Sequence, residues 1–261
     1  MARCAAGHVP ADNTKQPVGA HKGSVVNSLR TPALLMEGVS LRVKNRLLLS
    51  DFSLRVDKGT FHGLIGSNGS GKTSVMELAV GFRKPTTGRI EILGSAPTPR
   101  RPALLRRIGI AAQNPGFLPR SSVREHLLSI AEIFGSTVRD VDILLEALML
   151  EDCVDTRVEE ISVSERQRLA VASAVVHRPE ILFLDEPTAN LDHEARRNLV
   201  SLLRSSNIIG TTTLYTTRRL DEIETLCDEV TILDKPDTFA QPRRYFAAER
   251  AMPLPVFGGW R

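Results

Sequence analysis

The stretch GLIGSNGSGKTS constrains the fold of this chain more strongly than any other part of the sequence. Gly66 is followed by four residues and then by Gly71, Lys72 and Thr73, which is the spacing of a phosphate-binding loop. Such a loop joins a strand to a helix, and here it follows an apolar run and precedes an amphipathic one. Its glycines allow a tight turn whose N–H groups face phosphate oxygens, and the helix dipole adds positive charge. The sequence therefore predicts a strand, a phosphate-binding turn and a helix, in this order.

The residues of this loop have separate predicted roles toward a bound nucleotide. Lys72 is expected to reach the β- and γ-phosphates, and the hydroxyl of Thr73 is expected to hold Mg²⁺. The candidates for binding the phosphates are, besides these two, Gly66, Ser67, Asn68, Gly69, Ser70, Gly71 and Ser74. The alternative is a glycine-rich turn that contains a lysine by chance, and the spacing and position of the loop argue against it.

The run ILFLDEP at residues 181–187 supplies the second half of such a site. Four apolar residues predict a buried strand that delivers Asp185 to its carboxyl end. There Asp185 is expected to bind the magnesium shell, and Glu186 is expected to polarise an attacking water. By itself the run is better explained by a strand with an acidic turn, but after a phosphate loop the catalytic interpretation is favoured.

Strands and helices are expected to alternate along the middle of the chain. Short apolar or β-branched runs predict strands at residues 53–56, 61–66, 89–93, 108–112, 180–186, 211–217 and 229–234. Amphipathic runs predict helices at residues 72–82, 122–134, 141–150, 164–177, 193–206 and 220–227. This alternation indicates an α/β fold with a mainly parallel central sheet.

The net charge of +4 is concentrated at the two ends of the chain. Residues 1–33 carry four basic residues and one acidic residue, residues 235–261 carry five and two, and 25 basic and 27 acidic residues lie between them. The middle therefore has no positive excess, which argues against a nucleic-acid partner. The aperiodic residues 1–33 are expected to be a disordered tail. Residues 235–261 are expected to form a basic aromatic tail, which leaves one domain at residues 34–234.

Two further features bear on the compartment in which the protein works. No stretch approaches the roughly 18 apolar residues of a membrane helix, and the first ten residues lack the apolar core of a secretory signal. Cys4, Cys153 and Cys227 are far apart and have the spacing of neither a zinc site nor a disulfide framework. A protein of the reducing cytosol is expected.

From residue 33 to residue 234 the chain resembles an ATP-binding cassette (ABC) domain, the nucleotide-binding subunit of membrane transporters. Gln113 in AAQNPGFLP matches the family's glutamine loop, and Asp192 in NLD matches its D-loop. The stretch ISVSERQRL lies where the family's signature motif opens the helix before the acidic strand. The resemblance implies a P-loop NTPase of ABC type, in which an antiparallel β subdomain and an α-helical subdomain at about residues 114–164 accompany the central sheet.

The resemblance also implies partners and a mechanism. Two such subunits would hold each Mg-ATP between the phosphate loop of one and the signature helix of the other, where Ser162 and Asp192 would face nucleotide. Gln113 would contribute to metal binding and catalysis. Hydrolysis would drive a separate membrane permease, which places the subunit at the cytoplasmic face of the cell membrane. VREHLLSIAEIFG after the glutamine loop resembles most closely the subunits of drug and antibiotic exporters.

The signature stretch departs from the family's Leu-Ser-Gly-Gly-Gln pattern. Ser162 keeps the hydroxyl, but Val163 and Ser164 replace both glycines. The β-branched Val163 adds bulk where a bare backbone is expected to approach phosphate. Ser162 and Glu165 also make a Ser-x-x-Glu capping box, so the stretch is alternatively only a helix start. The two interpretations are compatible.

Two other positions depart from the family. Arg218 in TLYTTRRLDE replaces a histidine, and it can grip a γ-phosphate but cannot accept a hydrogen bond from water. Its alternative interpretation is a solvated surface arginine. Val43 stands where an aromatic residue often stacks on adenine, so weaker nucleotide binding is expected.

These observations leave two functions open. In the first, the chain is a working ATPase subunit of a transporter, in which Glu186 positions water and Arg218 only slows the cycle. In the second, it is a nucleotide-binding, hydrolysis-poor partner of a more complete cassette subunit. A soluble cassette ATPase of nucleic-acid or cluster-assembly type is a third possibility, which the acidic balance of the middle disfavours.

Overall fold

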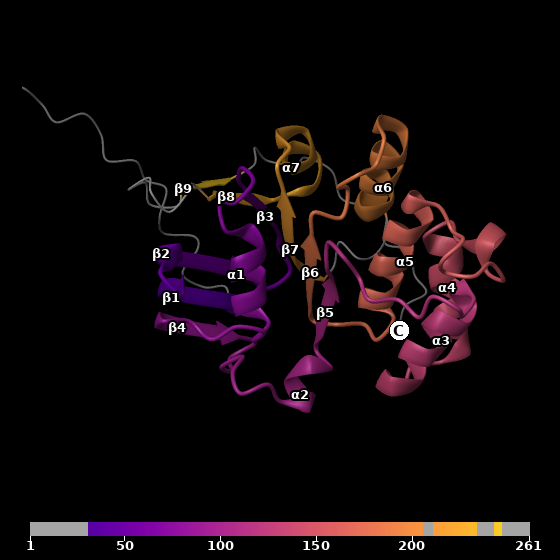
Figure 1. Ribbon diagram of the computed structural model, residues 1–261, viewed down its shortest axis with the longest axis horizontal. Coiled ribbons are helices and arrows are strands. Elements are labelled where there is room, and N and C mark those ends of the chain that lie inside the picture. The colour runs from indigo at the N-terminus through magenta and orange to yellow at the C-terminus, as the bar shows by residue number, and fades with distance from the viewer. Residues whose placement is uncertain (1–30, 206–210, 234–242, 247–261) are drawn as a thin grey trace, which may run out of the picture. The chain divides into compact units, whose positions relative to one another are not determined.

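The computed structural model describes residues 31–205, 211–233 and the strand at residues 243–246 (Figure 1). The disordered tail expected at residues 1–33 lies outside these residues except for its last three. Strand β1 begins at Pro32, so the folded part starts before the expected residue 34. Most of the expected C-terminal tail lies outside the described residues too, but residues 243–246 form strand β9.

The central sheet has six strands in the order β5-β6-β7-β3-β8-β9. Its first five strands are parallel, which confirms the predicted mainly parallel sheet, and β9 pairs antiparallel with β8 at the edge. A segment expected to be part of a tail therefore extends the sheet. The strands are β3 Phe61–Ile65, β5 Ile108–Ala111, β6 Ile181–Asp185, β7 Thr212–Thr217, β8 Glu229–Ile232 and β9 Arg243–Phe246.

Strand β6 shows why its sequence is a continuous apolar run. All five of its residues are buried. Leu182 and Leu184 belong to a core with helices α3 to α7, whereas Ile181 and Phe183 belong to a second core on the other face. A strand covered on both faces has no exposed alternate positions, so it lacks the alternating pattern of a half-exposed strand.

The second core lies between the central sheet, helix α1 (Lys72–Ala79) and a three-stranded antiparallel sheet. This smaller sheet has the order β2-β1-β4 and consists of β1 Pro32–Val43, β2 Arg46–Asp57 and β4 Thr87–Ile92. β1 and β2 form a hairpin in which Val43 pairs with Arg46. The antiparallel β subdomain implied by the family resemblance is therefore present.

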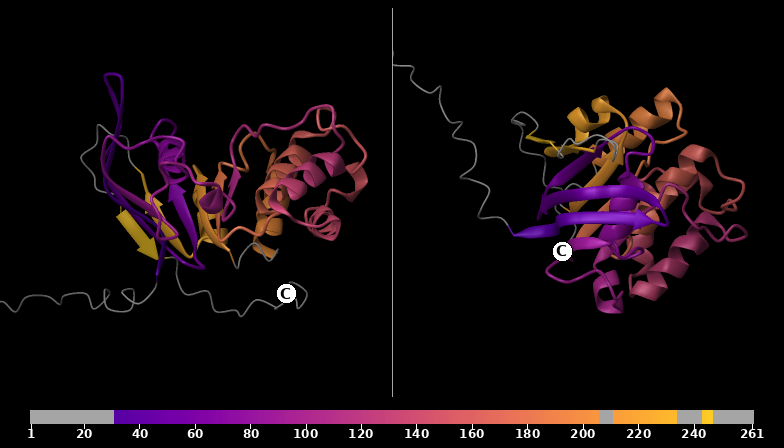
Figure 2. Two further views of the ribbon diagram at one scale, coloured as in Figure 1. Left: turned by 90° about the horizontal axis from the view of Figure 1, so that it is seen from below. Right: turned by 60° about the vertical axis from the view of Figure 1, so that its left-hand side comes forward.

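The remaining helices include the inserted α-helical part of the fold. They are α2 Pro102–Leu105, α3 Val123–Phe134, α4 Val138–Ala147, α5 Val163–Val175, α6 His193–Ser205 and α7 Leu220–Leu226, with a short 3₁₀ turn at Glu151–Cys153. Figures 1 and 2 show α3 and α4 on the opposite side of the parallel sheet from the antiparallel sheet. Helix α4 begins three residues before its predicted start, because Thr137 and Asp140 form a capping box there.

The strand order brings the predicted site together. Strands β3, β5, β6 and β7 are parallel, so their carboxyl ends meet at one edge of the sheet. The phosphate loop follows β3, Gln113 follows β5, Glu186 follows β6 and Arg218 follows β7. Ligands of open α/β sheets bind outside this edge.

Candidate nucleotide-binding site

The phosphate loop begins directly after β3 with Gly66, and any larger residue at this position would displace its neighbours. A Cβ on Gly66 would lie 2.5 Å from the carbonyl oxygen of Leu233. Gly71 ends the loop with φ 108°, and a Cβ there would lie 3.1 Å from the carbonyl oxygen of Leu48. The loop is therefore held closely between Leu233, which follows β8, and Leu48 of β2, and its shape needs both glycines.

Helix α1 starts directly after Gly71, and no side chain caps its first turn. The first N–H groups of a helix lack partners inside the helix, so an anion is a suitable partner for them. A cavity of about 420 Å³ lies against this turn. It is lined by Arg46, Leu48, Asn68, Gly69, Gly71, Lys72, Thr73, Ser74, Gln113, Glu186 and Arg218.

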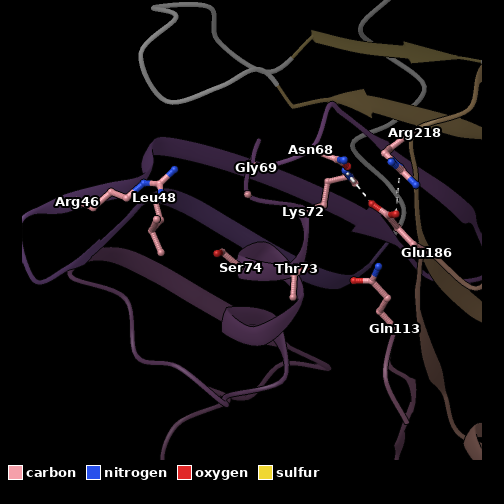
Figure 3. Close-up of a pocket in the computed structure, with 11 residues that line it drawn as sticks. Arg46, Leu48, Asn68, Gly69, Lys72, Thr73, Ser74, Gln113, Glu186 and Arg218 are labelled. Carbon is pink, nitrogen blue, oxygen red and sulfur yellow. Dashed lines mark ion pairs between the residues drawn. The ribbon is translucent and has the colours of Figure 1, made fainter. Parts of the chain in front are cut away.

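The cavity thus collects nine of the predicted site residues. Figure 3 shows Arg46 and Leu48 at one end, Thr73 and Ser74 in the middle, and the catalytic candidates at the other end. Gly66, Ser67 and Ser70 belong to the loop without lining the cavity. Arg46 and Leu48 were missed by the sequence analysis, because nothing local to β2 shows that this strand lies over the loop.

Lys72 lies at the end of the cavity that also contains Glu186 and Arg218. Its side chain is 5% exposed, and its ammonium donates hydrogen bonds to the carbonyl oxygens of Gly66 (2.7 Å) and Ser67 (3.1 Å). The same nitrogen lies 3.0 Å from Oε1 of Glu186. All three donors of the ammonium therefore have partners within the site.

Glu186 lies between two cations. While Oε1 faces Lys72, Oε2 lies 3.2 Å from Nε of Arg218 (Figure 3). The backbone of Glu186 has φ 46°, an uncommon value for a side chain of this size. Its N–H is held by the hydroxyl (2.9 Å) and the carbonyl oxygen of Thr216. Lys72 and Arg218 thus hold the carboxylate of Glu186, and Thr216 holds its backbone N–H.

Asp185 is the buried member of the acidic pair, with 5% of the residue exposed. Burial raises the pKa of its carboxyl, and the nearby charge of Glu186 adds to this rise. Hydrogen bonds from Thr216 and Thr73 and the charge of Lys72 lower the pKa. Carboxylate and hydroxyl oxygens are ligands that Mg²⁺ accepts, so the pair of Asp185 and Thr73 fits a divalent cation whose charge would offset the desolvation.

Thr216 is a third residue of the site that the sequence analysis missed. Its hydroxyl donates to Oδ1 of Asp185 (2.7 Å) and accepts the N–H of Glu186 (2.9 Å). One hydroxyl on β7 therefore orients both acidic residues at the end of β6, the last residue of the strand and the one after it. In the sequence, TTTLYTT indicates only a strand, because threonine is common in strands for reasons of shape alone.

A buried glutamate on helix α7 forms hydrogen bonds with residues on both sides of the catalytic end of the cavity. Glu222 on α7 is 2% exposed and accepts hydrogen bonds from the hydroxyls of Thr188 (2.8 Å), Tyr215 (2.9 Å) and Thr217 (2.5 Å). Burial also raises the pKa of Tyr215. The cluster joins the turn after Glu186 to the end of β7, so it fixes both flanks of the catalytic end.

The signature stretch forms the start of helix α5, as its capping box predicts. The N–H of Glu165 donates to the hydroxyl of Ser162 (3.2 Å), and the N–H of Ser162 donates to the Glu165 carboxylate (2.8 Å). Hydrogen bonds to the Glu165 carboxylate from the hydroxyl and then the N–H of Ser162 lower the pKa of this carboxyl. Ser162 does not line the cavity of its own subunit, and Val163 is 54% exposed. Asp192 similarly accepts the N–H of Ala195 (2.8 Å) at the start of α6 and lies outside the cavity lining.

Replacing Ser162 with alanine is expected to destabilise the protein by about 1 kcal/mol, because the first turn of α5 loses its cap. Urea denaturation of the purified chain measures this change. Ser129→Ala, within α3, is the matched control, since that serine donates only to the carbonyl oxygen of Glu125 in its own helix. Equal stabilities of the two variants would show that the cap contributes nothing.

A phosphate loop, an acidic strand end and a glutamine at one edge of a parallel sheet define a phosphate-loop nucleotide-binding protein. A family model described as ABC transporter matches residues 49–189. Over 240 residues the chain is 33% identical to "Nod factor export ATP-binding protein I" of Rhizobium leguminosarum bv. viciae, covering 89% of this chain and 77% of that protein. A protein of the same name from Burkholderia thailandensis is 35% identical over 217 residues, covering 81% and 71%.

Solved structures agree with this match. The ATP-binding subunit of an ABC transporter superposes with a TM-score of 0.68 at 25% identity, covering 77% of this chain and 85% of that one. A bacterial Atm1-family ABC exporter with ATP bound has a TM-score of 0.69 at 25% identity, covering 78% and 37%. The chain belongs to the ABC transporter family, as an ATP-binding subunit of the ATPase type. The predicted family and fold class are thereby confirmed.

The search for membrane-spanning segments covered the residues that the structure describes. None of the helices there is both long enough and apolar enough to cross a bilayer.

Proposed function

We propose that this subunit binds Mg-ATP at a dimer interface and hydrolyses it to ADP and phosphate to drive a separate membrane permease, in the direction of export. The observation that supports hydrolysis most directly is Glu186, held beside Lys72 at the end of the cavity where the γ-phosphate would lie. Two relatives are named as export proteins, which supports the direction. The subunit would lie at the cytoplasmic face of the membrane, attached through the permease.

The residues suited to hold Mg²⁺ are Thr73, Asp185 and Gln113. Gln113 lines the cavity at its catalytic end, and Asp185 and Thr73 supply oxygen ligands beside it. When bound, the ion neutralises charge on the β- and γ-phosphates.

ATP binding requires an exchange of partners at Lys72 and Arg218. Both cations pair with Glu186 before the nucleotide arrives, and phosphate oxygens are stronger partners for them than one carboxylate. Once the phosphates take these cations, Glu186 is free to accept a proton from the attacking water. A guanidinium has hydrogen-bond donors and no acceptor, so Arg218 can stabilise the γ-phosphate but cannot itself accept that proton.

Ser162 can serve both of the roles that the sequence suggests. Its oxygen accepts the N–H of Glu165, and its O–H donates to the Glu165 carboxylate, a hydrogen bond that it would exchange for one to a phosphate oxygen. In a dimer this O–H would meet the γ-phosphate bound by the partner subunit. The half-exposed Val163 would lie beside it, and its bulk would lengthen the approach of the backbone to phosphate.

The second candidate function is a hydrolysis-poor partner in a heterodimeric complex, and the ion pair between Arg218 and Glu186 favours it. The test is Mg-ATP hydrolysis by the purified chain at saturating nucleotide, with ATP binding recorded in the same samples. Turnover that rises with subunit concentration supports the working ATPase. Binding without turnover rejects a self-sufficient homodimer and supports the heterodimer, whereas absence of binding contradicts both.

Replacing Arg218 with histidine is expected to raise the turnover number by up to about fivefold, because a half-exposed ion pair to the catalytic base contributes up to about 1 kcal/mol. A steady-state assay measures the change. Arg89→His is the matched control, since Arg89 pairs with Glu91 on the antiparallel sheet, outside the cavity. A lower turnover in Arg218→His would show that Arg218 stabilises the transition state more than it restrains Glu186.

A further inference from the structure

The imidazole of His126 on helix α3 joins two segments that carry residues of the proposed site. One is the segment that follows Gln113, whose side chain lines the cavity (Figure 3). The other is helix α5, whose first turn is capped by Ser162. His126 is 4% exposed and does not line the cavity. It is therefore a buried titratable group that the proposed reaction does not use.

The two ring nitrogens of His126 have different partners. Nε2 lies 3.3 Å from the hydroxyl oxygen of Ser173 on α5, and Nδ1 lies 3.4 Å from the backbone nitrogen of Leu118. The hydroxyl of Ser173 donates to the carbonyl oxygen of Leu169 (2.7 Å), so its oxygen can accept a hydrogen bond from Nε2–H. Nδ1 then accepts the N–H of Leu118. These contacts fit the neutral ring with its proton on Nε2 and leave no place for a second proton on Nδ1.

The bond to Leu118 matters because little else holds the segment that follows Gln113. In the part of the chain that the structure describes, residues 114–118 form no other hydrogen bond to a helix or strand. The ring of Phe117 meets the imidazole edge-on, with centroids 5.2 Å apart. The backbone is held again at Pro119, whose carbonyl oxygen accepts the N–H of Glu159 (3.2 Å). His126 is thus the contact of α3 that restrains the stretch between Gln113 and Pro119.

We propose that His126 is a positioning residue for Gln113: in its neutral form it ties the segment after Gln113 to helix α5, and a second proton on its ring releases that segment. The inference deepens the proposed function, on which it rests, because Gln113 holds Mg²⁺ there. A proton on Nδ1 would make two donors face each other, since the N–H of Leu118 would lose its acceptor. That N–H would then turn to solvent, which the 51% exposure of Leu118 permits.

Burial lowers the pKa of His126 from its ordinary value of 6.5, so the ring is mainly neutral at pH 7 and above. The charged residues of the three elements around it, which have partners elsewhere or are exposed, are Arg120 of the segment, Arg124 and Glu125 of α3, and Arg166 and Arg168 of α5. Release of the segment therefore begins only as the pH falls below 6.5.

Two substitutions separate the two ring nitrogens. His126→Asn places an amide oxygen where Nδ1 lies, so it keeps an acceptor for Leu118 and loses the donor to Ser173. His126→Gln places an amide nitrogen near Nε2, so it keeps the donor to Ser173 and loses the acceptor for Leu118. Each variant loses one hydrogen bond, so similar melting temperatures are expected. A difference in function between them therefore belongs to the contact with Leu118.

The test combines hydrogen exchange with steady-state kinetics on the full chain. At pH 7.5, amides of residues 113–118 are expected to exchange faster in His126→Gln than in the native chain or in His126→Asn. The kcat for Mg-ATP is expected to fall by about two- to tenfold in His126→Gln, the change that one neutral hydrogen bond supports, with KM unchanged. His126→Asn is expected to keep the native kcat. Below pH 6.5 it is also expected to lose less activity than the native chain, because it has no ring to protonate.

Equal exchange in the Asn and Gln variants would overturn the inference. Faster exchange in His126→Gln with an unchanged kcat would overturn the role toward Gln113, and equal acid dependence of the native chain and His126→Asn would overturn the release by a proton. Failure of the proposed function looks different, because the native chain then hydrolyses no ATP. The exchange measurement still decides in that case whether His126 holds the segment.

Discussion

Replacing Glu186 with glutamine is expected to lower the rate of ATP hydrolysis by about 100- to 10,000-fold, the usual contribution of a positioned general base. Glutamine keeps the shape and the N–H contact to Thr216 but cannot take the proton of the attacking water. The measurement is phosphate release by the purified subunit at saturating Mg-ATP.

The same substitution is expected to strengthen ATP binding slightly. In the native chain both oxygens of Glu186 pair with cations that the phosphates need, at 3.0 Å from Lys72 and 3.2 Å from Arg218. A neutral amide competes less for these cations. Weaker ATP binding in the variant would contradict this competition between carboxylate and phosphate.

Glu146→Gln is the control for removal of a carboxylate as such, since Glu146 is exposed on helix α4. Its turnover is expected to equal that of the native subunit. If Glu186→Gln hydrolyses ATP at the native rate, the activity belongs to another base or to a contaminating enzyme.

The core of the site was predictable because its chemistry depends on local spacing. A phosphate loop needs its glycines, lysine and threonine within a few residues, and a parallel α/β sheet brings its strand ends to one edge. Lys72 and Glu186, far apart in the sequence, could therefore be expected to meet, and they lie 3.0 Å apart. The cap formed by Ser162 was predictable for the same reason, since its partner is three residues away.

The missed residues owe their roles to contacts between distant segments. Arg46 lines the cavity only because the β1–β2 hairpin lies over the phosphate loop, where the carbonyl oxygen of Leu48 approaches Gly71. Thr216 and Glu222 act through hydroxyl contacts that leave no distinct pattern in a threonine-rich strand or an amphipathic helix. Strand β9 was missed because its basic sequence is typical of a tail, and only its pairing with β8 makes it a strand.

Replacing Lys72 with methionine is expected to weaken Mg-ATP binding by about 100-fold or more. The ammonium would otherwise make charge-assisted hydrogen bonds to two phosphates, each worth about 1.5 to 3 kcal/mol. Methionine has a similar length and no charge. Calorimetric titration with the imido analogue of ATP measures the loss, and Lys84→Met, at an exposed position, is the control.

The Lys72→Met variant has a second effect, because Lys72 also holds the phosphate loop and Glu186 in place. Its ammonium bonds to the carbonyl oxygens of Gly66 and Ser67 and pairs with Glu186, so its loss leaves the carboxylate with Arg218 alone. A fall in thermal stability is therefore expected beside the fall in affinity. The double variant Lys72→Met, Glu186→Gln separates the two effects, because it also removes the carboxylate that has lost Lys72 as a partner. If Lys72 acts on phosphate, the double variant regains stability and still binds ATP weakly; if it regains native affinity, Lys72 serves only to neutralise Glu186.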